Sequence, residues 1–189
     1  MRVRKLGVLM VCLGNICRSP MAEGVLRARL EDAGLADKVR VDSAATGRSH
    51  IGYAPDERAI ACANRHGIDI SAQRARALEI ADFDDFDFIL CADRTILHDA
   101  RVRKPRTAHA DVELLLEWSG VGKKDIPDPY YGDSSDFEKA FKLVDAAQKS
   151  WRRLDGHNQL PKLIQGVRFT DGIEVAANPA SSQSQTAAA

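Results

Sequence analysis

A cysteine and an arginine separated by five residues, at the junction of a buried strand and a helix, constrain this chain more than any other feature. Cys12 and Arg18 enclose Leu-Gly-Asn-Ile-Cys, and an apolar run from Val8 to Val11 comes directly before them. A loop of this length directs its backbone N–H groups toward one centre, which the positive end of the following helix also faces. The sequence therefore predicts a cradle for a tetrahedral oxyanion such as phosphate.

The two ends of this loop suggest its chemistry. Cys12 is predicted at the base of the cradle, where the amides, the helix dipole and the Arg18 guanidinium favour thiolate over thiol. Arg18 carries a planar fork that matches two phosphate oxygens. The pattern is therefore typical of a phosphatase with a thiolate nucleophile. The predicted phosphate-binding residues are Leu13, Gly14, Asn15, Ile16, Cys17 and Arg18.

Four more residues favour this interpretation. Gly14 is expected to supply a backbone position with positive φ, and Asn15 a side chain that binds its own backbone. Ser19 is expected to cap the helix, with Pro20 at its first position.

Apolar strands alternate with amphipathic helices along the chain. Strands are predicted over 6–12, 39–44, 87–92 and 111–116, although 111–116 also fits a helix. Helices are predicted over 19–33, 55–65, 94–100 and 135–154. This alternation predicts an α/β fold: a single-domain, open, four-stranded parallel sheet with helices on both faces, of the flavodoxin-like type. Ligands of such sheets bind at the carboxyl ends of the strands, where Cys12 falls.

Composition excludes several classes of function. The 189 residues suit one domain, and Lys+Arg equals Asp+Glu at 27 each, so we expect neither nucleic acid nor a membrane surface as a partner. The sequence has no apolar run near the ~20 residues of a membrane span and no signal-peptide pattern, so a cytoplasmic location is expected.

Four cysteines are too few for a disulfide scaffold of this size. Cys12 and Cys17 lack the neighbouring His or second Cys pair of a zinc site, so we expect no metal. Cys62 lies in a helical pattern and Cys91 in an apolar run, and both are predicted to be core packing residues.

The character of the chain changes after Leu154. Residues 1–154 are predicted to form the domain and 155–189 a C-terminal extension. Within it, 176–189 is rich in Ala, Ser and Gln without periodicity and is predicted to be disordered.

A second segment offers a candidate proton donor, which the loop lacks. A leaving phenolate or alkoxide needs a proton, and Asp128 stands in the run Asp-Pro-Tyr-Tyr-Gly beside Tyr130 and Tyr131. Taken alone, this segment is more simply interpreted as a turn with surface tyrosines. Beside the Cys12 loop, we favour a general acid next to an aryl-phosphate site.

Together these segments resemble the low-molecular-weight protein tyrosine phosphatase family. The resemblance covers about residues 6–154 and rests on four ordered motifs: the Cys12 loop, Val-Asp-Ser-Ala-Ala-Thr at 41–46, Arg-His-Gly-Ile at 65–68 and the Asp128 segment. It implies a phosphotyrosine phosphatase I-like fold and hydrolysis of phosphotyrosine through a cysteinyl-phosphate intermediate, without a cofactor.

The resemblance also implies individual roles. Cys12 attacks phosphorus, Arg18 binds the phosphoryl oxygens, and Asp128 protonates the leaving group and then activates water. Ser19 donates a hydrogen bond to the Cys12 sulfur. The residues implied to support the loop are Ser19, Asn15, Ser43 and His66, although His66 also fits a surface residue at a helix end. The implied partner is a phosphotyrosine-containing protein, such as a tyrosine kinase, and the implied state is a monomer or weak dimer.

Two positions leave alternatives open. Cys17 is either a small packing residue or, as in the family, the redox partner that forms a reversible disulfide with Cys12 under peroxide. The family usually has an aromatic cleft residue where this chain has Ser49, and Tyr53 is the candidate to compensate. The expected substrate cleft is Ser49, Tyr53, Tyr130 and Tyr131.

Other functions on the same fold remain as alternatives. A protein-arginine phosphatase tends to have threonine where this chain has Ile16, and an apolar residue suits a phenyl ring better. An arsenate reductase needs paired thiols after the third strand, and no cysteine follows Cys91. A non-catalytic phosphate-binding module would not need all the catalytic residue types.

Overall fold

Four parallel strands form one sheet in the order β2-β1-β3-β4. The computed structural model describes residues 5–149 of the chain. The strands are β1 (Leu6–Cys12), β2 (Val39–Ala45), β3 (Phe88–Cys91) and β4 (Asp111–Leu114). The predicted open, four-stranded parallel sheet is therefore confirmed.

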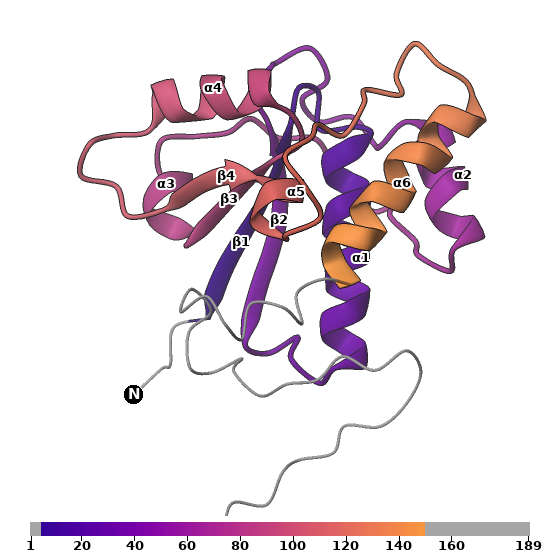
Figure 1. Cartoon of the computed structure of the whole chain (residues 1–189), viewed down its shortest axis with the longest axis horizontal. Helices are drawn as coiled ribbons and strands as arrows, with labels where there is room; N and C mark the ends of the chain where they lie inside the picture. Colours follow the sequence, from indigo (N-terminus) through magenta and orange to yellow (C-terminus); the bar gives the residue numbers. More distant parts are fainter. Residues whose placement is uncertain (1–4, 150–189) are drawn as a thin grey trace, which may run out of the picture.

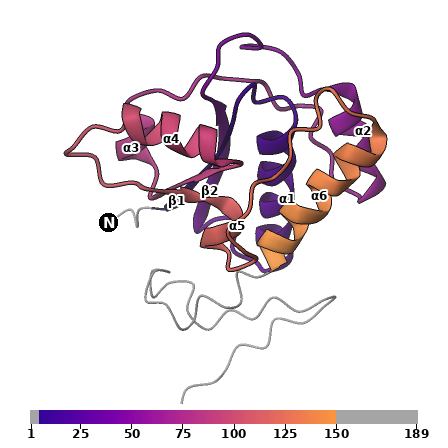
Figure 2. The same cartoon turned by 45° about the horizontal axis from the view of Figure 1, so that its top comes forward.

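Helices cover both faces of this sheet. Figures 1 and 2 show α1, α2 and α6 together on one side and α3 and α4 on the other. The helices are α1 (Arg18–Asp32), α2 (Glu57–Arg65), α3 (Asp82–Asp85), α4 (Arg94–Arg103), α5 (Leu115–Trp118) and α6 (Ser134–Lys149).

Alternate residues of β1 point into the two halves of the core. Val8 and Met10 pack with residues of α1, α2 and α6, whereas Leu9 and Val11 pack with residues of α3 and α4. All four side chains are at most 1% exposed. A parallel strand buried on both faces reads as a continuous apolar run, which explains why β1 is so evident in the sequence.

The strand order positions the site. From β1 the chain first adds β2 on one side and later returns to add β3 on the other. Loops that leave β1 and β3 therefore diverge at the carboxyl ends of neighbouring strands and open a crevice between them. Cys12 ends β1, and Asp93 caps the helix that follows β3.

Several predicted boundaries need correction. Helix α1 begins at Arg18 with Cys17 as its N-cap, so the prediction that Ser19 caps it with Pro20 at the first position is wrong. The physical reason is that the Ser19 hydroxyl bonds the Cys12 sulfur instead of the helix amides. Helix α2 begins after Asp56, whose carboxylate accepts from the Arg58 amide.

Segment 111–116, predicted as a strand that also fits a helix, contains both: β4 ends at Leu114 and α5 begins at Leu115. Helix α3 was not predicted, because four residues give no periodicity. The predicted end of the last helix at 154 and the extension 155–189 lie outside the described residues.

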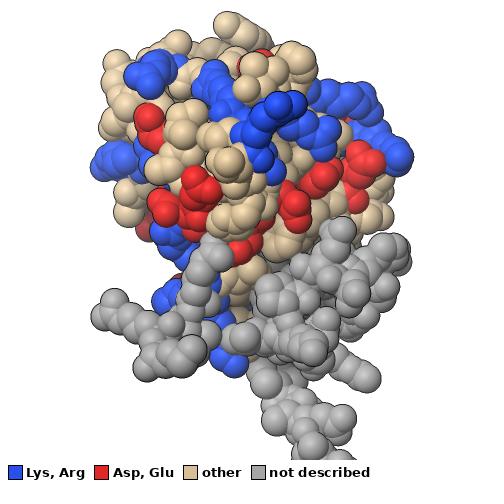
Figure 3. All heavy atoms as spheres, turned by 90° about the vertical axis from the view of Figure 1, so that its left-hand side faces the viewer, with Lys and Arg blue, Asp and Glu red and all other residues tan. Residues whose placement is uncertain are grey.

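Charges of both signs share the surface on the side of α3 and α4, as Figure 3 shows. α3 carries Asp82, Asp84 and Asp85, whereas α4 carries Arg94, Arg101 and Arg103. This face therefore presents no field of a single sign. Within residues 5–149, none of the helices has the length and apolar character needed to cross a membrane.

Candidate active site

The loop 13–17 is fixed by backbone bonds from two later segments. The carbonyl of Leu13 accepts from the Gly47 amide at 2.9 Å, and the carbonyl of Ile16 accepts from the Asp56 amide at 2.8 Å. A Cβ atom on Gly47 would lie 2.9 Å from the Leu13 carbonyl oxygen, so only glycine allows this approach. These two bonds attach the loop to the segment that follows β2 and to the residue that precedes α2.

The Cys12 sulfur lies at the base of the loop, where the side chain is 2% exposed. The Asn15 amide donates to it at 3.3 Å, and the Ser19 Oγ lies 3.0 Å away. The same Ser19 oxygen accepts from the Asn15 Nδ2 at 2.9 Å, which leaves its single proton for the sulfur. A hydroxyl and a backbone amide therefore both face the sulfur.

Asn15, and not Gly14, is the loop residue with positive φ, so the prediction for Gly14 is wrong. At φ +55° Asn15 has the left-handed conformation that asparagine tolerates better than most side chains. Its side chain does not bind its own backbone as predicted. Its Nδ2 donates to Ser19 and Ser43 at 2.9 Å each, and its Oδ1 accepts from the Arg76 amide at 2.9 Å.

A buried carboxyl continues this network. The Ser43 hydroxyl donates to Glu23 at 2.5 Å, so hydrogen bonds connect Glu23 through Ser43, Asn15 and Ser19 to Cys12. Burial raises the pKa of Glu23, while the Ser43 hydrogen bond acts in the opposite direction. The sequence analysis missed Glu23, although its place four residues after Ser19 puts both on one face of α1.

Arg18 lies between two carboxylates. Its Nη1 lies 2.5 Å from Asp93, and its Nη2 lies 2.8 Å from Asp128. Its Nη1 also donates to the Ile126 carbonyl at 3.1 Å. Burial would lower the pKa of Arg18, but Cys12, Asp128 and Asp93 raise it above its ordinary value. Asp93 was missed, although its place just after the strand beside β1 could have indicated it.

The Asp128 segment is attached to α2 by one arginine. Arg58 donates to the carbonyls of Tyr130 and Gly132, both at 3.0 Å, and pairs with Asp56 at 2.8 Å. The sequence analysis did not identify Arg58, since nothing in its local pattern connects it to a segment about 70 residues later.

The loop and the acid segment enclose a cavity of about 250 Å³. Asp128 and Arg18 lie in its wall beside Cys12, and Tyr131 at the rim is 97% exposed. The full lining is Cys12, Leu13, Gly14, Ile16, Cys17, Arg18, Gly47, Ser49, His50, Asp128, Tyr130 and Tyr131.

His50, the neighbour of Ser49, lines the cavity, whereas Tyr53, the predicted compensating side chain, does not. The His50 ring lies 5.9 Å from the Tyr130 ring and 6.0 Å from the Tyr53 ring, measured between centroids. Tyr53 is 64% exposed and stands outside the lining, whereas Ser49 belongs to it. The sequence analysis missed His50.

The structure places His66 outside the network that supports the loop. His66 follows α2, and its Nε2 bonds Glu138 on α6 at 2.8 Å. The interpretation of His66 as a residue at a helix end is therefore correct, and its assignment to loop support is wrong.

The other three cysteines are all buried. Burial, with a contribution from Asp56, raises the pKa of the Cys17 thiol well above its ordinary value. Cys91 is 0% exposed within β3, as predicted for core packing. A buried strand residue does not provide the mobile thiol that an arsenate reductase needs.

Comparisons with known proteins agree on one family. A family model described as low molecular weight phosphotyrosine protein phosphatase matches residues 7–162. The human protein of that name is 46% identical over 136 residues, which are 71% of this chain and 85% of the relative. The Schizosaccharomyces pombe protein of that name is 41% identical over 148 residues, 77% of this chain and 94% of the relative.

Solved structures give the same result. A protein tyrosine phosphatase from Entamoeba histolytica, with Hepes in the active site, superposes with a TM-score of 0.75 at 27% identity, covering 82% of this chain and all of that one. YfkJ from Bacillus subtilis superposes with a TM-score of 0.73 at 34% identity, covering 84% of this chain and all of that one.

Asn15 provides a test of the hydrogen-bond network. Asn15→Ala removes three hydrogen bonds and leaves a Cβ residue at positive φ, so we expect the free energy of unfolding to fall by about 2–4 kcal/mol. Asn15→Gly loses the same bonds without the backbone strain, so its free energy of unfolding should fall by about 1 kcal/mol less than that of Asn15→Ala. Urea denaturation measures both, with exposed Asn64→Ala as the control. Equal stability of wild type and Asn15→Ala would show that the network does not hold the loop.

Proposed function

The chain belongs to the low molecular weight phosphotyrosine protein phosphatases, enzymes that hydrolyse phosphate monoesters, and on that premise we propose how its own residues divide the reaction. The observation that supports the proposal most is the convergence of Cys12, Arg18 and Asp128 on one cavity. A nucleophile, an oxyanion binder and a proton donor are the three groups that this hydrolysis needs.

In the first step the Cys12 thiolate attacks phosphorus. The bond between phosphorus and the tyrosine oxygen breaks, and the phosphoryl group becomes attached to sulfur. The loop amides and Arg18 bind the three phosphoryl oxygens while their charge is redistributed. The hydrogen bond from Ser19 to the sulfur stabilises the thiolate before attack and again when the sulfur leaves.

Asp128 gives its proton to the departing phenolate oxygen. In the structure this carboxylate pairs with Arg18 at 2.8 Å, and a bound phosphoryl dianion competes for the same guanidinium. Substrate binding therefore releases Asp128 from Arg18 and leaves its carboxyl free to face the leaving group. Asp128 is 43% exposed at its side chain, so it exchanges protons with solvent between turnovers.

Water completes the cycle. The Asp128 carboxylate takes a proton from a water molecule, whose oxygen attacks phosphorus and breaks the bond to sulfur. Inorganic phosphate leaves, and Cys12 returns to the thiolate. The same carboxyl acts as acid and then as base, as expected when the second step retraces the geometry of the first.

The cavity walls suit an aromatic substrate. Tyr130 and Tyr131 pack edge to face with centroids 5.0 Å apart, and Leu13 and Ile16 supply apolar surface opposite the polar base. We propose that the phenyl ring of phosphotyrosine lies between these walls, with the ring of His50, the neighbour of Ser49, as a further wall of the cavity.

The proposal extends to partners and location. A phosphotyrosine-containing protein, such as a tyrosine kinase, binds as substrate, and the enzyme acts as a monomer or weak dimer. We assign it to the cytoplasm, a compartment that keeps thiols reduced and therefore suits a thiolate nucleophile and four free cysteines.

Replacing the nucleophile tests the assignment directly. Cys12→Ser should lose turnover of para-nitrophenyl phosphate and phosphotyrosine peptides while still binding inorganic phosphate, because the cradle remains. Arg18→Lys should also be severely impaired, since a point charge cannot replace a bidentate fork. Steady-state kinetics and phosphate titration by calorimetry measure these effects. Substantial hydrolysis by folded Cys12→Ser would overturn the assignment.

A leaving-group series tests Asp128. Asp128→Asn should slow phosphotyrosine and phenyl phosphate by about 10²–10⁴-fold. Aryl phosphates with acidic leaving groups should slow less, because they depart without much protonation. Asp125→Asn, a neighbour that pairs with Arg94, is the control and should retain activity. An equal loss across the whole series would make Asp128 a structural residue.

Peroxide inactivation tests Cys17. Peroxide oxidises the Cys12 thiolate to a sulfenic acid, and the Cys17 thiol then displaces water to form a disulfide. Cys17→Ser should keep substantial activity in reductant but recover poorly with thiols after oxidation. Mass spectrometry of the oxidised protein should show the Cys12–Cys17 linkage. Full recovery of Cys17→Ser would return Cys17 to a packing role.

A further inference from the structure

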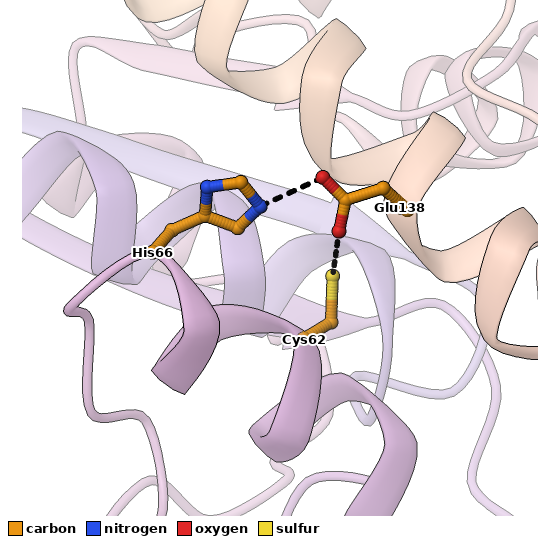
Figure 4. Close-up of side chains that lie close together, drawn as sticks. All are labelled: Cys62, His66 and Glu138. Atoms are coloured by element: carbon orange, nitrogen blue, oxygen red, sulfur yellow. Dashed lines mark hydrogen bonds and ion pairs between the residues drawn. The ribbon is translucent and has the colours of Figure 1, made fainter.

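Three side chains with metal-binding atoms converge on the face of the molecule formed by α2 and α6. Cys62 and His66 come from α2 and its C-cap, and Glu138 comes from α6. Figure 4 shows all three directed toward one point. From the sequence no metal is expected and Cys62 is assigned to core packing, because the contact between α6 and α2 is not visible in the sequence.

The ligand atoms already have nearly the separation that a small tetrahedral ion requires. The Cys62 Sγ lies 3.5 Å from one Glu138 oxygen, and the His66 Nε2 lies 2.8 Å from the other. All three ligand atoms lie within 4.8 Å of one another. Zinc bonds of 2.0–2.3 Å at tetrahedral angles separate ligand atoms by roughly 3.3–3.6 Å. Small side-chain rotations are therefore enough to close the site.

Local structure holds two of the ligands in position. Cys62 and His66 are four residues apart, a spacing that places both on one side of a helix. The His66 ring stacks on Phe141 with centroids 4.1 Å apart and planes 10° apart, which directs its Nε2 toward Glu138. A histidine fixed in this way loses little rotamer freedom when it binds an ion.

The ligand set selects the class of metal. We propose that Cys62, His66 and Glu138 bind a zinc-type divalent ion that joins α2 to α6. One thiolate, one imidazole and one carboxylate are borderline-soft ligands, which favour Zn²⁺ over Mg²⁺ or Ca²⁺. The His66 and Glu138 side chains are 36% and 26% exposed, so the ion enters from solvent, and water takes the fourth position.

Protons and charges balance in this site. The Cys62 thiol donates its proton toward a Glu138 oxygen at 3.5 Å, so the sulfur is protonated before metal binding. The ion displaces this proton into solvent as the sulfur–metal bond forms. Arg65 lies 3.4 Å from Glu138, and this half-exposed arginine turns away into solvent when the ion takes its place.

The proposed metal site lies between the two helices that support the Asp128 segment. α2 also carries Arg58, which holds the Tyr130 and Gly132 carbonyls, and α6 begins two residues after Gly132. An ion between Cys62 and Glu138 therefore fastens together the two helices from which the Asp128 segment is supported.

Cobalt provides a spectroscopic test, because Co²⁺ occupies zinc sites and gives an intense sulfur-to-metal absorption band with a thiolate ligand. The full chain with Cys12→Ser removes the active-site thiolate and should bind one Co²⁺ with such a band. Zn²⁺ should displace Co²⁺ and abolish the band. Zn²⁺ should also raise the melting temperature of the protein, because it binds the folded state.

Matched variants in the same background identify the ligands. Cys62→Ser should abolish the band, whereas Cys91→Ser, at the buried thiol of β3, should retain it. His66→Gln and Glu138→Gln should weaken Co²⁺ binding at least about tenfold. Loss of a residue that only supports a metal ligand already weakens metal affinity by about 10–100-fold. His98→Gln, on the exposed side of α4, should leave it unchanged.

Two results would overturn the proposal. One is the absence of a thiolate band in the Cys12→Ser protein, and the other is unchanged Co²⁺ affinity in Glu138→Gln. Glu138 is partly exposed, so Glu138→Gln should fold and tests the proposal even if Cys62→Ser does not fold. None of these measurements uses phosphatase activity, so their outcome is independent of the proposed catalytic roles.

Discussion

The left-handed backbone of Asn15 is the constraint on which the site depends. Within the loop 13–17, Asn15 is the residue in this conformation, with φ +55°, and its amide donates to the Cys12 sulfur. The same side chain satisfies Ser19, Ser43 and the Arg76 amide, so the strain is offset by three hydrogen bonds. Because Asn15 also bonds Ser19, which contacts the Cys12 sulfur, one side chain connects the shape of the loop to the surroundings of Cys12.

The fold and the centre of the site could be predicted because their signals are local. β1 is a seven-residue strand buried on both faces, so its apolar run and its end at Cys12 are evident in the sequence. The spacing from Cys12 to Arg18 gives the loop. Local patterns were weaker guides to detail: Gly14 looked like the natural residue for positive φ, and Ser19 looked like a helix cap. In both cases hydrogen bonds that connect Asn15, Ser19 and Cys12 decided the outcome.

The residues that sequence reasoning missed act through contacts between distant segments. Asp93 reaches Arg18 because β3 pairs with β1, and Arg58 reaches Tyr130 across 72 residues of chain. Neither side chain has a motif of its own, and their roles become visible only when the strand order is known. His66 shows the opposite error. It belongs to a recognisable motif, yet its contact is with Glu138 on α6 and not with the loop.

Arg18 pairs with two carboxylates in the structure and is proposed to bind phosphoryl oxygens in the reaction. A buried guanidinium requires negative partners, since an unpaired buried charge is costly. Asp93 and Asp128 fill that need, but they are not equivalent: Asp93 is fixed as the cap of α4, whereas Asp128 lies on an exposed segment. In the proposed reaction, a phosphoryl group displaces the more exposed carboxylate, Asp128, and leaves Asp93 paired with Arg18. The residue released in this exchange is the one proposed to give a proton to the leaving group, so binding of substrate frees the carboxyl that the proposed reaction needs.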